Sequence, residues 1–257
     1  MRSFPLLVLA LVGLAACDKK EPPASSPATT TPSATVERTA PPRSAPPSRE
    51  LMRDHFTAVV LVRDALIAGN LDLVRWNATF LAEREPDPSV ASWSQYVAQL
   101  RERAAKVAGA TTLPSAAMAS TELALECGRC HAANAATPVF PALDRRVDAS
   151  GTRPHMLRHQ WAAEQMWNGL IGPSEERWNA GVAELAEAPL APEEIAANAT
   201  VLPAIAELGE DVHALGAQGS KATTWNERAE IYGRLLATCA SCHSGSPRNG
   251  TSTPSAP

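Results

Sequence analysis

The sequence predicts an all-helical protein, and two observations support this. Aromatic residues make up only 5% of the chain, and the apolar residues are mainly Ala and Leu, so runs typical of strands are scarce. Residues suited to a core instead recur every three or four positions, which is the spacing of one face of a helix. One such series is Met52, His55, Val59, Val62 and Leu66.

The N-terminal region differs in composition from the rest. Residues 1–16 combine the charged Arg2 with a short apolar run, which predicts an export signal and is too short to cross a bilayer. Residues 18–49 hold eight of the 22 prolines, with Ser, Thr and Ala between them. Such a segment cannot build a packed core, so folded chain is expected from about residue 50 onward.

The segment Leu14-Ala15-Ala16-Cys17 resembles the lipobox of bacterial lipoproteins. The resemblance implies cleavage before Cys17 and lipid on its sulfur and new amino terminus; the alternative is an ordinary signal peptide followed by a chance cysteine. Residues 17–49 would then be a tether that reaches about 100 Å at ~3.1 Å per residue. Asp18 resembles the inner-membrane retention signal of enterobacterial lipoproteins. We therefore expect an exported protein, lipid-anchored at the periplasmic face of a membrane, with the inner membrane favoured.

The rest of the chain is a tandem duplication, with units at 50–135 and 153–245. Met52-x-x-His55 returns as Met156-x-x-His159, an offset of 104 residues (156 minus 52). Three further pairs of segments match: Leu66-Ile67 with Leu170-Ile171, Arg75-Trp76-Asn77-Ala78 with Arg177-Trp178-Asn179-Ala180, and Cys127-Gly128-Arg129-Cys130-His131 with Cys239-Ala240-Ser241-Cys242-His243. Proline and glycine mark residues 136–152 as a connector, and 246–257 is a polar tail.

Each unit is predicted to contain four helices. In the first unit, Gly69 ends the first helix and Asn70 is placed to cap the second, which runs to Glu85. Pro114 and Ser115 open a fourth helix that runs into Cys127. Between them, a third helix is lined by Trp93, Tyr96, Leu100 and Val107.

The second unit repeats this arrangement. Its second helix follows Pro173-Ser174, its third starts near Pro192, and its last ends at His243. Pro203 falls within the third helix and predicts a kink or a split there. Two tandem antiparallel four-helix bundles are the most economical architecture.

The five cysteines divide completely between the lipid site and the two Cys-x-x-Cys-His segments, so none is left for a disulfide. In a helix, cysteines at i and i+3 share a face, where two thiols can form thioethers to the vinyl groups of a porphyrin. Histidine at i+4 then points to the iron. We therefore expect two covalently attached haem c groups, with attachment at Cys127 and Cys130 (iron ligand His131) and at Cys239 and Cys242 (iron ligand His243).

Two other uses of this spacing fit less well. A structural zinc site calls for two Cys-x-x-Cys pairs some 15–20 residues apart, whereas 108 residues lie between Cys130 and Cys239. A thioredoxin-type redox pair calls for a βαβ pattern, which the sequence lacks. Covalent haem is therefore the favoured interpretation.

With the haem motif at the end of its fourth helix, each unit resembles the class II, cytochrome c prime-like family of four-helix-bundle cytochromes c. The units are shorter than typical members, and the likeness is specific only at the two pentapeptides. The resemblance implies that the haem lies between the helices. It also implies that the sixth iron position is either filled from the first helix or left open.

The repeated Met-x-x-His of the first helix offers candidates for that sixth position. Residues at i and i+3 share a face, so both side chains point inward and either could reach the iron. His55 and His159 are the preferred sixth ligands, Met52 and Met156 the alternative, and a vacant position the third possibility. Trp76 and Trp178 are expected to pack in the core, with a role as electron relays the alternative. His155 and His213 lack repeat partners and are expected at the surface.

The charge pattern and motifs also exclude some functions. The net charge of −4, without a Lys/Arg-rich block, speaks against nucleic acid as a partner. No phosphate loop, catalytic triad or other small-molecule substrate site is visible. The sequence predicts a membrane-tethered dihaem cytochrome c that carries single electrons between redox protein partners. The alternative is a haem enzyme or gas-binding sensor, peroxidase-like or binding nitric oxide, with an open iron position.

Overall fold

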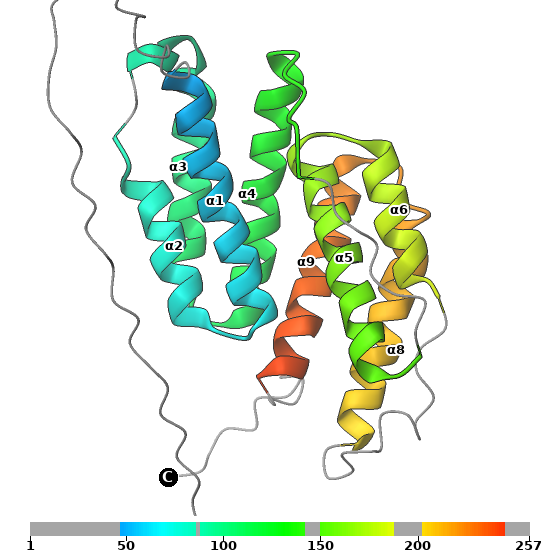
Figure 1. The fold of residues 1–257 in the computed structure, drawn as a ribbon. Coiled ribbons are helices and arrows are strands. Elements are labelled where there is room, and N and C mark those ends of the chain that lie inside the picture. Colours follow the sequence, from blue (N-terminus) through cyan, green and yellow to red (C-terminus); the bar gives the residue numbers. More distant parts are fainter. Residues whose placement is uncertain (1–46, 86–87, 142–149, 188–201, 245–257) are drawn as a thin grey trace, which may run out of the picture. The chain divides into compact units, whose positions relative to one another are not determined.

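The structure is a computed structural model that describes residues 47–85, 88–141, 150–187 and 202–244 (Figure 1). Within these ranges, every regular element is a helix. The prediction of an all-helical fold is confirmed. The first repeat forms α1 (Pro47–Ile67), α2 (Leu71–Glu83), the short 3-10 helix η1 (Pro88–Trp93), α3 (Ser94–Ala108) and α4 (Leu113–Ala133). The second forms α5 (Thr152–Ile171), α6 (Glu175–Leu185), α8 (Leu202–Gly219) and α9 (Trp225–His243).

Several predicted features lie outside the described residues. These are the export signal, the lipid site at Cys17, the tether, the polar tail and the helix start near Pro192. The helix that contains Pro203 begins at Leu202, so this proline falls in a first turn, where its missing N–H is tolerated. None of the helices within the described ranges has the length and apolar character that a membrane crossing requires.

Side-chain caps mark the starts of α2, α4, α6 and α9. The Asn70 side chain accepts a hydrogen bond from the Leu73 amide, as the sequence predicted, and Gly69 before it adopts a left-handed backbone with φ of +70°. Ser174 caps α6 in the same way. Thr112 and Thr224 begin α4 and α9 with reciprocal capping boxes. Each such cap contributes about 1 kcal/mol, because it satisfies a backbone donor that the helix leaves free.

Consecutive helices pack against one another within each repeat, and the two repeats join through α4 and α9. Helix α4 packs more extensively against α9 than against α1. The pair is antiparallel: Arg129 donates to Asn226 near one end, whereas Gly233 lies against Met118 further along. A Cβ on Gly233 would lie 2.6 Å from the Met118 sulfur, so glycine permits this close approach. All the described helices belong to one unit of the chain.

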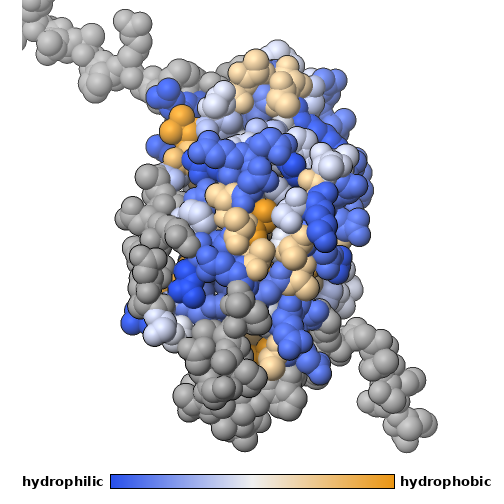
Figure 2. Space-filling view, turned by 90° about the vertical axis from the view of Figure 1, so that its right-hand side faces the viewer, coloured by the Kyte–Doolittle hydropathy of each residue, from blue (hydrophilic) through white to orange (hydrophobic). Residues whose placement is uncertain are grey.

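The core is continuous across both repeats. It includes Leu66 of α1, Leu123 of α4, Trp167 of α5 and Tyr232 of α9, all fully buried. The rings of Trp167 and Tyr232 lie 5.6 Å apart, and the Tyr232 hydroxyl donates to the Ala163 carbonyl at 2.7 Å. By contrast, the side of the molecule on which α6 lies carries mostly hydrophilic side chains (Figure 2).

The two tryptophans of the second helices lie on different faces. Trp178 is fully buried, as expected, but Trp76 is 77% exposed, so the expectation that both pack is wrong for Trp76. The caps explain the difference, because Trp76 follows Asn70 by six residues and Trp178 follows Ser174 by four. Two residues rotate a side chain about the helix axis by about 200°. The buried counterpart of Trp178 is Val74, and the Arg-Trp-Asn-Ala match is out of structural register.

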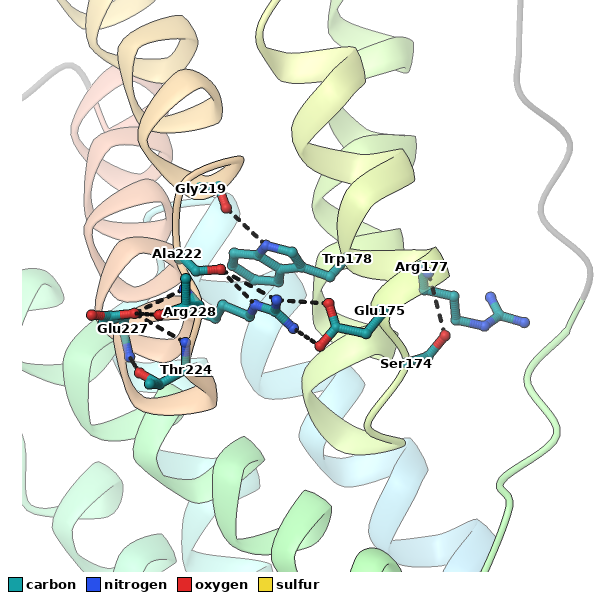
Figure 3. A network of polar contacts seen from close by, with 10 residues as sticks. Ser174, Glu175, Arg177, Trp178, Gly219, Ala222, Thr224, Glu227 and Arg228 are labelled. Carbon is teal, nitrogen blue, oxygen red and sulfur yellow. Dashed lines mark hydrogen bonds and ion pairs between the residues drawn. The ribbon is translucent and has the colours of Figure 1, made fainter.

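A polar network holds α6, α8 and α9 together (Figure 3). The buried Arg228 guanidinium donates to both carboxylate oxygens of Glu175, at 2.6 and 2.7 Å, and lies over the Trp225 ring. The hydrogen bond from Arg228 lowers the pKa of Glu175. The indole N–H of Trp178 donates to the Gly219 carbonyl at 3.0 Å. The network therefore ties the first turn of α6 to the first turn of α9 and to the end of α8.

Candidate functional site

A cavity of about 900 Å³ lies beside the last turns of α4. Its wall comes from α1, η1, α3, α4, the residues that follow α4 and the last residue of α5, and it is mostly apolar. A wall of this kind is typical of cofactor sites. Among its lining residues are Met52, His55, Phe56, Trp93, Tyr96, Leu100, Cys127, Cys130, His131, Phe140 and Ile171.

Helix α4 continues unbroken through the first Cys-x-x-Cys-His segment and ends at Ala133. Cys127 and Cys130 therefore lie at helical spacing, and both contact the cavity together with His131. The four cysteines within the described part of the chain are free thiols. Burial raises the pKa of Cys127 to about 12 and that of Cys239 to about 12. At neutral pH the thiols of Cys127 and Cys239 are therefore protonated in the cofactor-free chain.

The histidine of each segment is held by a backbone carbonyl. His131 Nδ1 lies 2.8 Å from the carbonyl oxygen of Ile171, and His243 Nδ1 lies 2.5 Å from that of Ile67. A carbonyl only accepts, so Nδ1 carries the proton in both rings. With the Nδ1 side of each ring turned to a carbonyl, Nε2 is the ring nitrogen that could bind a metal.

The two candidates on α1 reach the same cavity as the α4 segment. Met52 and His55 both line it, as expected from their inward spacing. Burial, helped by the positive charge of Arg84, lowers the pKa of His55 to about 4. The imidazole is therefore neutral at physiological pH and can donate a lone pair to a metal.

In the second repeat, His159 lies in a cluster of three histidines. Its ring is 4.2 Å from that of His155 and 5.0 Å from that of His213, and the possible ligand atoms of the three lie within 4.8 Å of one another. Nε2 of His159 and of His213 are buried without a hydrogen-bond partner. The cluster can hold a metal ion by geometry, but Arg158 places a guanidinium 3.3 Å from His155 Nδ1 and opposes a divalent cation.

The expectation that His155 and His213 lie at the surface is wrong, because both are buried. His155 occupies the place of the buried Leu51, 104 residues earlier, and His213 is anchored through Nδ1 to the Leu185 carbonyl at 2.7 Å. The spacing of His155 and His159, at i and i+4, is the signal in the sequence that could have identified the cluster. Met156, the alternative ligand, is 40% exposed.

Comparison of the chain with protein-family models, with curated proteins and with solved structures finds no match.

Proposed function

We propose that the protein is a dihaem c-type cytochrome, built as two tandem antiparallel four-helix bundles, that carries single electrons between redox proteins. One observation carries the proposal. The two thiols of Cys127 and Cys130, the lone pair of His131 and the neutral ring of His55 all belong to one apolar cavity. That is the donor set of a c-type haem with two axial histidines.

The cavity beside α4 suits haem in size, polarity and ligands. Its volume of about 900 Å³ falls in the range of cofactor pockets, about 300–1,000 Å³. Cys127 and Cys130 would hold the porphyrin through thioethers, His131 would be the fifth ligand of the iron and His55 the sixth, with Met52 as the alternative. Bound haem would supply one-electron chemistry, while Phe56, Leu100 and the other apolar lining residues would pack against the porphyrin.

The second haem is assigned to Cys239, Cys242 and His243. The matching hydrogen bond from His243 Nδ1 to a carbonyl supports this assignment, because it leaves Nε2 available as it does in His131. His159 is the proposed sixth ligand and Met156 the alternative. The partial exposure of Met156 and the buried, unpartnered Nε2 of His159 favour the histidine.

The two haem motifs lie at opposite ends of the α4 and α9 pair. Because the helices are antiparallel and Arg129 pairs with Asn226, His131 is level with about Thr224. His243 is 19 residues further along α9 (243 minus 224), which is about 28 Å at 1.5 Å per residue. Sites so far apart suit electron entry at one end and exit at the other better than joint action on one substrate.

A haem enzyme or gas-binding sensor with an open iron position is the second candidate. The observation that favours it is the histidine cluster around His159. If His159 stays packed against His155 and His213, the second iron keeps an exchangeable position. In either case, the proposed location is the periplasmic face of a membrane, with a lipid anchor at Cys17.

Carbon monoxide distinguishes the two candidates. Full-length protein is matured in a bacterium that attaches haem covalently, then reduced and exposed to carbon monoxide, with absorption and electron paramagnetic resonance spectra recorded in both oxidation states. Two low-spin haems that do not bind the gas support the electron carrier. Stoichiometric binding at one haem contradicts the carrier with two axial histidines per iron and supports the enzyme or sensor.

A further inference from the structure

We propose that each haem site is completed by the other repeat. The carbonyl of Ile171, the last residue of α5, orients His131 of the first repeat, and the carbonyl of Ile67, the last residue of α1, orients His243 of the second. This inference rests on the proposed function and adds two positioning groups to it.

The two hydrogen bonds are reciprocal. Ile67 and Ile171 are equivalent residues, each ending the first helix of its repeat, and each accepts from the histidine of the opposite repeat at 2.5 and 2.8 Å. Ile171 also lines the cavity beside α4. The same contact therefore occurs twice, between different pairs of helices. A chance approach of one loop does not explain both contacts.

The acceptors are suited to this role by their place in the helix. The last carbonyls of an α-helix lack intrahelical donors and carry partial negative charge. Beyond α1, the amides of Gly69 and Asn70 donate to Leu66 and Ala65, and His243 donates to Ile67. An acceptor of this kind orients the ring and raises the basicity of its Nε2, which stabilises oxidised iron and lowers the reduction potential.

Glycine permits both contacts. A Cβ on Gly128, inside the first haem motif, would lie 2.4 Å from the carbonyl oxygen of Leu170, next to Ile171. In the second contact the glycine is on the other partner: Gly69 has φ of +70°, and a Cβ there would lie 2.9 Å from the Ser244 Cβ, next to His243. Gly69 belongs to the first repeat and to no haem motif, so it offers a clean test.

The test measures one haem at a time. Replacing Cys127 and Cys130 with Ala leaves only the second haem, and replacing Cys239 and Cys242 leaves only the first. In the protein that keeps only the second haem, Gly69→Ala should raise the reduction potential of that haem. We expect a shift of at least about tenfold in the one-electron equilibrium, which is about 59 mV, since second-shell changes typically alter a metal site by 10–100-fold. In the protein that keeps only the first haem, Gly69→Ala should leave the reduction potential unchanged.

Matched variants separate the contact from general damage. Gly69→Asn tolerates the left-handed backbone and keeps the added Cβ, so it should reproduce the shift. Gly209→Ala should change neither potential, because nothing lies within 4 Å of a Cβ at that helical position. Gly128→Ala should raise the potential of the first haem and leave the second unchanged.

A second readout follows the hydrogen bond directly. In protein labelled with ¹⁵N histidine, the ¹⁵N chemical shift of His243 Nδ1 should be that of a protonated, hydrogen-bonded ring nitrogen, and Gly69→Ala should move it. An unchanged second-haem potential together with an unchanged Nδ1 shift in Gly69→Ala would overturn the inference, as would equal changes of potential at both haems. Protein that carries no haem at all refutes the proposed function instead, so the two failures are distinguishable.

Discussion

The ring of His243 donates a hydrogen bond to the carbonyl of Ile67, a residue 176 positions earlier in the chain. The second haem motif is thus held by the first helix of the other repeat, and His131 is held by Ile171 in the same manner. Each motif histidine is therefore oriented by the opposite repeat. The proposed haem environment of either repeat would then depend on how the repeats dock.

Replacing His55 with Ala should remove the proposed sixth ligand of the proposed first haem. The iron should change from low-spin to high-spin and bind carbon monoxide after reduction, because the cavity would then offer an open position. Absorption and electron paramagnetic resonance spectra measure this change. A matched control is Met52→Ala, which should leave the spectrum low-spin. A low-spin first haem in His55→Ala would rule out His55 as the ligand.

Replacing His159 with Ala tests the second haem and the histidine cluster together. We expect one additional high-spin haem, because His159 is the proposed sixth ligand. His155→Ala and His213→Ala remove only neighbours of the ring and should leave both haems low-spin. If His159→Ala leaves the second haem unchanged, the ring serves the cluster alone, and the enzyme or sensor candidate gains support.

The register of the second helices predicts unequal effects of two tryptophan substitutions. Trp178→Ala should lower the free energy of unfolding by about 3–5 kcal/mol, because it empties a fully buried site and removes the bond to Gly219. Trp76→Ala should change it by less than about 0.5 kcal/mol, since that side chain is 77% exposed. Urea denaturation of the two variants measures the difference. Similar losses would contradict the register set by Asn70 and Ser174.

The pair of Arg228 and Glu175 should stabilise the fold in a pH-dependent way. The pKa of Glu175 is lowered in the folded state by the hydrogen bond from Arg228. Its contribution is therefore present above the usual carboxyl pKa of about 4.5 and is lost as the pH falls through the lowered value. Because Glu175 is largely exposed, we expect Glu175→Gln to cost only about 1 kcal/mol at pH 7.

Urea denaturation at pH 7 and at pH 3 measures this difference. The gap between the parent protein and Glu175→Gln should narrow at the lower pH. A gap of the same size at both values would show that the charge of Glu175 does not contribute.

Local signals in the sequence predicted most of the helix boundaries. Asn70 and Gly69 mark a cap and a left-handed turn, and the structure has both. The inward stripe that joins Met52 to His55 likewise depends only on helical spacing, and both residues reach the cavity. Features of this kind are set within one or two turns of helix, so the neighbouring residues are sufficient to reveal them.

Features that depend on register or docking were not predictable in the same way. The repeated Arg-Trp-Asn-Ala letters suggested equal roles for Trp76 and Trp178, but the caps rotate them to different faces. The hydrogen bond between His243 and Ile67 joins residues in different repeats. No local pattern in the sequence around either residue predicts it. It follows from the way α9 packs beside the end of α1, which depends on the whole core.

The mass of the mature chain tests the central claim most directly. Full-length protein is produced in a bacterium competent in covalent haem attachment, denatured and analysed by intact mass spectrometry. The account predicts an added mass of two haems, with one lost when Cys127 and Cys130 are replaced by Ala and the other when Cys239 and Cys242 are replaced. A chain that carries no covalent haem, or only one in the unmodified sequence, would contradict it.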